Sequence, residues 1–261
     1  MTKMLPLIVF IAVTAFGYKM VSAGTLSPVA FAALSGAIMI GMAFLRPKNA
    51  ITSKQNPEAI TNALGEYAKD AFTDDSKESA AFRSATKDFL ANMPKAAIAK
   101  LEKLRGECRN DVERYAVAMV SALAYINQNK YESAILEYNR AVVINPTSDL
   151  ALTIGSCQQR IGELKKARDS YEFALELDPQ NVKARSAMAT AWVASRKFNK
   201  ALEYAEMALE LDDTNASALA TAAICHGILG NDEEYSEFTA KAERYGYNRQ
   251  KIEDTVKALK K

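Results

Sequence analysis

The sequence predicts an all-α fold, with N-terminal transmembrane helices followed by an α-helical solenoid of about four helix-turn-helix repeats and flanking cap helices. Two observations carry this prediction: two apolar runs precede residue 46, and the second half of the chain has a period of 33–34 residues. The 261 residues are 49% hydrophobic and 25% charged, which excludes wholesale disorder.

The first predicted element is a membrane anchor at 1–48, with spans at about 4–20 and 27–45. Pro28 to Leu45 is almost wholly apolar and, with its uncharged flank, covers the ~30 Å hydrocarbon layer at ~1.5 Å per residue. The run from Met4 to Tyr18 is shorter, so a cleaved signal peptide stays open beside the helical hairpin that we favour.

The charge distribution predicts the topology of this anchor. Residues 1–54 contain five basic residues and no acidic one. Four of the five lie before the first run or after the second, and one lies in the loop between them. By the positive-inside rule, both ends of a hairpin then lie in the cytoplasm, which places the repeats at a bacterial-type inner or plasma membrane. Only if the second run fails to span does the body lie outside.

A polar linker at 49–56 precedes a helical region at 57–114, in which apolar patterns predict helices at about 57–72, 77–92 and 95–108. Pro57 and Pro94 suit first helical turns. Small residues fall out of register here, so we interpret this region as an N-terminal cap or a degenerate repeat.

The repeat register runs over 115–247 and is carried by small residues, aromatic residues and prolines at equivalent positions. They are Ala134, Ala167 and Ala201; Ala141, Ala174, Ala208 and Ala242; Tyr138 and Tyr171; and Pro146 and Pro179. Small side chains allow close helix packing. Gly155 permits a close approach, and Gly162 and Gly230 fall between paired helices, where a positive φ ends the first helix.

The stretches 125–146, 155–179, 192–213 and, more loosely, 226–247 resemble the tetratricopeptide repeat family. The resemblance implies a superhelical stack of four units, whose concave surface binds protein or peptide partners and is lined mainly by the first helix of each unit. The last unit departs from the pattern, and the charged segment 248–261 is expected to form a C-terminal capping helix.

The register assigns a partner-binding groove. Its predicted residues are Met119, Leu123, Ile126 and Asn127; Leu152, Ser156, Gln159 and Arg160; Lys183, Ser186, Thr190 and Val193; and Ala220, Ile224 and Ile228. Several apolar members suit the core between repeats equally well. Part apolar and part polar, the groove favours an amphipathic helix or an extended segment over a small molecule. The family's Lys/Asn clamp for chaperone tails is absent, because Met119 and Leu123 occupy its positions.

No catalytic, cofactor-binding or metal-binding residue is predicted. The only histidine, His226, takes a slot that holds Tyr125 and Trp192 in earlier units, which favours packing. Cys157 and Cys225 share a repeat position, which is typical of small buried residues. Residues 55–261 hold 28 basic and 31 acidic residues, a balance that argues against a nucleic-acid partner.

These observations favour a non-catalytic, membrane-anchored adaptor that holds a protein or peptide partner at the cytoplasmic face. The alternative is an extracytoplasmic chaperone-like or envelope-biogenesis factor, and membrane topology separates the two.

Overall fold

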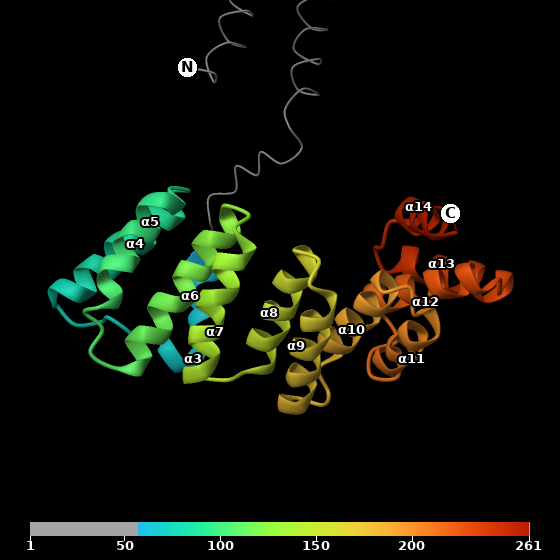
Figure 1. Cartoon of the computed structure of the whole chain (residues 1–261), viewed down its shortest axis with the longest axis horizontal. Helices are drawn as coiled ribbons and strands as arrows, with labels where there is room; N and C mark the ends of the chain where they lie inside the picture. The colour runs from blue at the N-terminus through green and yellow to red at the C-terminus, as the bar shows by residue number, and fades with distance from the viewer. Residues whose placement is uncertain (1–56, 261) are drawn as a thin grey trace, which may run out of the picture. The chain divides into compact units, whose positions relative to one another are not determined.

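The computed structural model describes residues 57–260, and these form twelve α-helices (Figure 1). Their bounds are α3 (Pro57–Ala68), α4 (Lys77–Leu90), α5 (Pro94–Arg105), α6 (Asp111–Asn127), α7 (Tyr131–Ile144), α8 (Ser148–Arg160), α9 (Leu164–Leu177), α10 (Val182–Ala194), α11 (Phe198–Leu209), α12 (Ala216–Leu229), α13 (Asp232–Arg244) and α14 (Arg249–Leu259). The all-α prediction is confirmed for this part of the chain.

Four helix pairs make up the repeat block: α6 with α7, α8 with α9, α10 with α11, and α12 with α13. The pairs follow one another along the array in Figure 1. The first helices also pack on one another, because α10 contacts both α8 and α12. This arrangement places α8, α10 and α12 side by side. The first unit begins at Asp111, four residues before the predicted start, because Asn110 caps α6 by accepting a hydrogen bond from the Glu113 amide.

The same turn ends the first helix of every unit. The residues with positive φ are Asn129, Gly162, Arg196 and Gly230, at 58°, 83°, 55° and 85°. One residue later in each turn, a backbone N–H donates to the carbonyl five residues before it in the closing helix: the acceptors are Tyr125, Gln158, Trp192 and His226. The predicted glycine turns at 162 and 230 are confirmed. The other two units form the same turn with Asn129 and Arg196 in place of glycine.

Tight packing between paired helices rests on the predicted small residues. Ala134, Ala167 and Ala201 are fully buried at the start of α7, α9 and α11. Gly155 of α8 lies so close to α9 that an added Cβ would stand 2.4 Å from Cε1 of Tyr171 and 3.0 Å from the carbonyl oxygen of Ala167. This contact fixes the position of α8 relative to α9.

The helices before the first unit pack against α6. Ile60 and Leu64 of α3 join the core that contains Met119, and Tyr67 meets Tyr115 edge to face with ring centroids 5.1 Å apart. The predicted helix 57–72 ends early, at Ala68, and Phe72 adopts a φ of 59° before α4 begins. The structure therefore lays α3 along one flank of the first unit.

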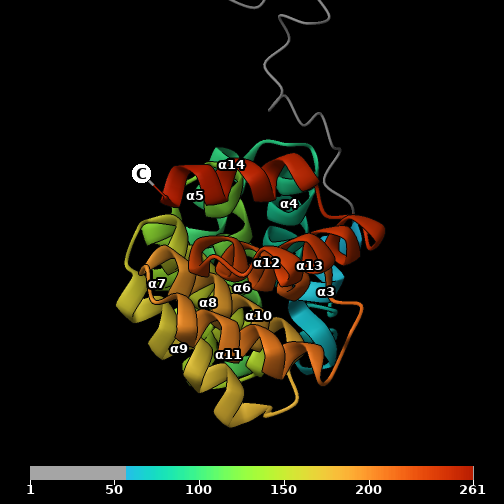
Figure 2. The same cartoon turned by 90° about the vertical axis from the view of Figure 1, so that its right-hand side faces the viewer.

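At the other end, α14 lies beside α12 and α13, as Figure 2 shows. Its apolar residues Ile252 and Val256 are buried, while the rest of the helix is largely exposed. The guanidinium of Arg196 donates to the carbonyl of Leu259 at 2.5 Å, which ties the end of α14 to the turn after α10.

Within the described residues, no helix is long and apolar enough to cross a membrane. The predicted spans at 4–20 and 27–45 lie outside those residues.

Candidate binding groove

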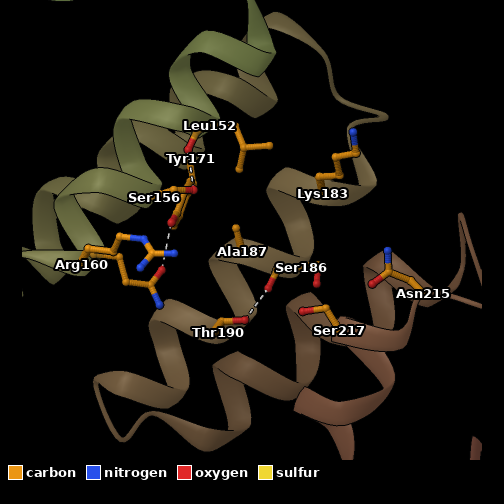
Figure 3. A pocket seen from close by; sticks show the side chains of 11 residues that line it. Leu152, Ser156, Arg160, Tyr171, Lys183, Ser186, Ala187, Thr190, Asn215 and Ser217 are labelled. Atoms are coloured by element: carbon orange, nitrogen blue, oxygen red, sulfur yellow. Dashed lines mark hydrogen bonds between the residues drawn. The ribbon is translucent and has the colours of Figure 1, made fainter. Parts of the chain in front are cut away.

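A cavity of about 620 Å³ opens across α8, α10 and the start of α12. Seven of the predicted groove residues line it: Leu152, Ser156, Gln159, Arg160, Lys183, Ser186 and Thr190. Because these residues recur at steps of three or four along two helices that pack on each other, their side chains share one face. The structure therefore brings together the second-unit and third-unit parts of the predicted set (Figure 3).

Four further residues complete the lining: Tyr171, Ala187, Asn215 and Ser217. Ser217 lies one period after Lys183, so the repeat register contained a signal for it. Asn215 caps α12, with its Oδ1 accepting a hydrogen bond from the Ala218 amide. Tyr171 belongs to a second helix, and in the sequence it served only as a marker of the repeat register.

Hydrogen bonds fix the floor of the cavity. The Tyr171 hydroxyl donates to Oε1 of Gln159 at 2.9 Å, and the Thr190 hydroxyl donates to the Ser186 carbonyl at 3.0 Å. Burial raises the pKa of Tyr171, so its hydroxyl keeps the proton that it donates. The side chain of Tyr171 thus links the Gly155 contact in the core to a polar residue of the groove.

The lining carries positive charge only. Arg160 and Lys183 lie on opposite sides of the cavity in Figure 3, and no acidic side chain lines it. Both cations are exposed; Arg160 lies 5.5 Å from the centroid of the Tyr131 ring. Ser186 is buried, and its hydroxyl has no hydrogen-bond partner among the described residues.

The first-unit residues lie elsewhere. Met119, Leu123 and Ile126 line a separate cavity of about 700 Å³ together with α3 and the start of α8. Met119 is only 7% exposed, because α3 packs against α6. Asn127 lies at the end of α6, where its amide donates to Oδ1 of Asn92 at 3.4 Å.

Val193 and Ile224 do not reach the groove either. They are 8% and 7% exposed and belong to the core cluster that contains Ile252 and Val256 of α14. The physical reason is that this cluster closes the end of the helix array. Ala220, also predicted for the groove, is buried in the same cluster, and Ile228 packs against it.

The residues considered for chemistry have packing roles here. His226 stacks on Phe238 with ring centroids 5.3 Å apart, and its Nδ1 lies 3.1 Å from the side-chain Nδ2 of Asn231. Burial raises the pKa of the Cys225 thiol to about 12 and also raises that of Cys157. Among residues 57–260, no group of three or more His, Cys, Asp and Glu side chains is arranged to hold a metal ion.

Comparison with known proteins names the repeat. Residues 117–148 and 149–181, the first two units, match the family model described as tetratricopeptide repeat. The chain carries tetratricopeptide repeats. The third and fourth units continue the same helix pairing and the same turn geometry.

Solved structures share this tetratricopeptide fold. The crystal structure of YrrB, described as having an unusual peptide-binding site, is 17% identical and superposes with a TM-score of 0.56 over 74% of this chain and 99% of that one. A crystal structure of MamA is 17% identical, with a TM-score of 0.56 over 62% of this chain and 93% of that one. At such identities the likeness shows the fold alone.

Curated relatives are larger proteins. The "Protein CTR9 homolog" of Arabidopsis thaliana is 27% identical over 154 residues, which are 50% of this chain and 14% of that protein. "Sperm-associated antigen 1" of Mus musculus is 30% identical over 114 residues, 44% of this chain and 13% of that protein. The chain thus spans about one seventh of the length of these relatives.

Proposed function

We propose that this protein is a non-catalytic, membrane-anchored tetratricopeptide scaffold that holds a protein or peptide partner at the cytoplasmic face of a bacterial-type inner membrane. The partner lies in the groove across α8, α10 and α12. One observation carries the proposal: seven residues chosen from the repeat register alone line a single cavity of about 620 Å³. Tetratricopeptide repeat proteins bind protein or peptide partners, and such scaffolds are generally non-catalytic.

The lining suits a polypeptide better than a compact metabolite. Hydroxyls and amides, such as those of Ser156, Ser217 and Asn215, alternate with small apolar surface at Leu152 and Ala187. An extended segment presents backbone N–H and C=O groups at regular intervals, so dispersed polar groups of this kind meet several of them at once.

Support for the membrane anchor comes from the sequence. The apolar run from Pro28 to Leu45 has the length of a span, and the basic residues of the first 54 positions flank the two runs. The second candidate, an extracytoplasmic factor, requires that only the first run anchors or targets the chain; a signal peptide ending at the small-residue site Val21-Ser22-Ala23 fits it if the second run does not span.

Groove binding is tested by affinity purification of the full chain from its source cells. Leu152→Glu places a charge on the groove wall, and Leu136→Glu on α7 is the matched control, since Leu136 is 54% exposed and lies outside the cavity. We expect a partner that is lost with the first variant and kept with the second. Equal recovery with both variants contradicts groove binding.

Location is tested by fusing a fluorescent reporter and an export-dependent phosphatase in turn after Lys261. Fluorescence without phosphatase activity is the result expected for cytoplasmic repeats. Phosphatase activity without fluorescence supports the extracytoplasmic candidate and contradicts the proposed location.

A further inference from the structure

Basic and acidic side chains line different cavities of the helix array. All 31 acidic residues of the chain lie between 57 and 260, and none of them lines the 620 Å³ groove. The neighbouring cavity on the α3 side has the opposite character, because Glu66 and Asp149 line it and no Lys or Arg does. Both cavities use residues of α8, so the sign of the lining changes across this one helix.

The two groove cations have no ion pair in the described part of the chain. The acidic residues nearest to them in sequence have other partners: Glu163 pairs with Lys166 at 2.8 Å, and Oδ1 of Asp178 accepts a hydrogen bond from the Gln180 amide at 3.0 Å. Arg160 ends α8 and Lys183 lies in the first turn of α10, on the other side of the cavity. A ligand that lies between them meets positive charge on both sides.

The rest of the lining adds hydrogen-bond donors. Ser217 presents a hydroxyl in the first turn of α12, next to Asn215, whose Oδ1 caps the helix and whose side chain also hydrogen-bonds the Asp212 carboxylate. Carboxylates accept hydrogen bonds from such amides and hydroxyls, and they form the strongest ones with guanidinium and ammonium groups.

We propose that the groove selects an extended partner segment rich in Asp or Glu, with carboxylates placed against Arg160 and Lys183 and the chain between them over Leu152 and Ala187. This inference rests on the proposed function and adds the chemistry of the partner. The small apolar centre leaves room for a backbone with short side chains, and the charge sorting across α8 disfavours acidic residues in the cavity beside α3.

The test is a fluorescence anisotropy titration of the full chain in neutral detergent. The probes are three fluorescein-labelled nonapeptides with Ser at alternate positions, a central Leu, and Glu, Gln or Lys at the remaining positions. We expect the Glu peptide to bind about tenfold more tightly than the Gln peptide, with the Lys peptide weakest, because two exposed ion pairs each contribute roughly threefold. The preference should shrink as salt is raised from about 50 to 200 mM.

Substitutions at three positions assign the effect to the groove. Arg160→Gln and Lys183→Gln should each weaken the Glu peptide about threefold, and together about tenfold, without changing the Gln peptide. Lys165→Gln is the matched control, since Lys165 is an exposed cation of α9 outside the lining, and it should leave all affinities unchanged. These substitutions replace exposed side chains, so the helices should be retained, which circular dichroism checks for each variant.

Each contrary outcome has a distinct meaning. Equal binding of Glu and Gln peptides, or a Glu peptide insensitive to the double variant, overturns the acidic preference. If the Gln or Lys peptide then binds and Leu152→Glu abolishes it, groove binding stands and only its chemistry was wrong. If no peptide binds at millimolar concentration, the acidic preference is overturned, and the purification with Leu152→Glu decides the fate of the groove itself.

Discussion

Gly155→Ala is expected to destabilise the second repeat, although alanine is the better helix former. The new Cβ would stand 2.4 Å and 2.6 Å from two ring carbons of Tyr171 and 3.0 Å from the Ala167 carbonyl oxygen. The ring cannot swing aside freely, because Tyr171 is 1% exposed and its hydroxyl bonds Gln159. Reaching ordinary contact distance therefore requires α8 and α9 to separate by about 1 Å.

Two opposing terms set the magnitude. Overpacking a dense core costs about 1–3 kcal/mol, and an overlap with a locked ring and a backbone oxygen belongs at the upper end. Replacing a mid-helix glycine by alanine returns up to about 1 kcal/mol. The net loss is about 2 kcal/mol, which lowers the melting temperature by roughly 4–8 °C for a domain of this size.

The assay is thermal unfolding of the full chain followed by circular dichroism. Gly106→Ala is the matched control, since Gly106 has ordinary helical φ and no atom within 4 Å of an added Cβ. That control should be stabilised by about 0.4–1 kcal/mol. If Gly155→Ala melts at or above the wild-type temperature, the close approach does not fix the groove wall, and the packing argument is refuted.

Three further results are expected. Arg109 and nearby serine hydroxyls hold the pKa of Asp74 well below its ordinary value of 3.8. The ionised Asp74 carboxylate therefore stabilises the fold above pH 3.8, and this stabilisation is lost as the pH falls below that value. Melting temperatures measured between about pH 5 and 2 should drop more steeply for wild type than for Asp74→Asn. Ser186→Ala should raise the free energy of unfolding by about 1 kcal/mol in urea titrations, because it removes a buried hydroxyl that lacks a partner. Burial raises the pKa of Cys225 to about 12 and that of Cys108 to about 11, so thiol reagents at pH 8 should label both rapidly only after denaturation.

Much of the observed helix pairing could be predicted from the repeat period, because the alanine and glycine positions that carry the period can be read directly from the sequence. Alanine at a helix crossing and glycine in a turn each have a steric reason that is visible in the sequence. Asn129 and Arg196 adopt the same positive φ without that signal, at 58° and 55°. Their conformation follows from the helix pairs on both sides, which only the fold supplies.

The groove shows a similar division. Helical spacing identified the face that Leu152 and Lys183 share, because that face depends on local geometry. It did not reveal which parts of the face other helices cover. Met119 is buried beside α3, and Ile224 is buried in the cluster that includes α14. Both outcomes depend on where the flanking helices α3 and α14 pack. The apolar residues of these helices show that they are buried, but not which part of the array they cover.

The most direct test of the groove account is site-specific photo-crosslinking of the full chain in its source cells. A benzoylphenylalanine replaces either Ser156, an exposed groove residue, or Val143, which is 83% exposed on α7 and outside the cavity. The account predicts a light-dependent adduct of one defined mass from position 156 that disappears with Leu152→Glu, and none from position 143. An adduct from position 143 alone, or one from position 156 that survives Leu152→Glu, contradicts it.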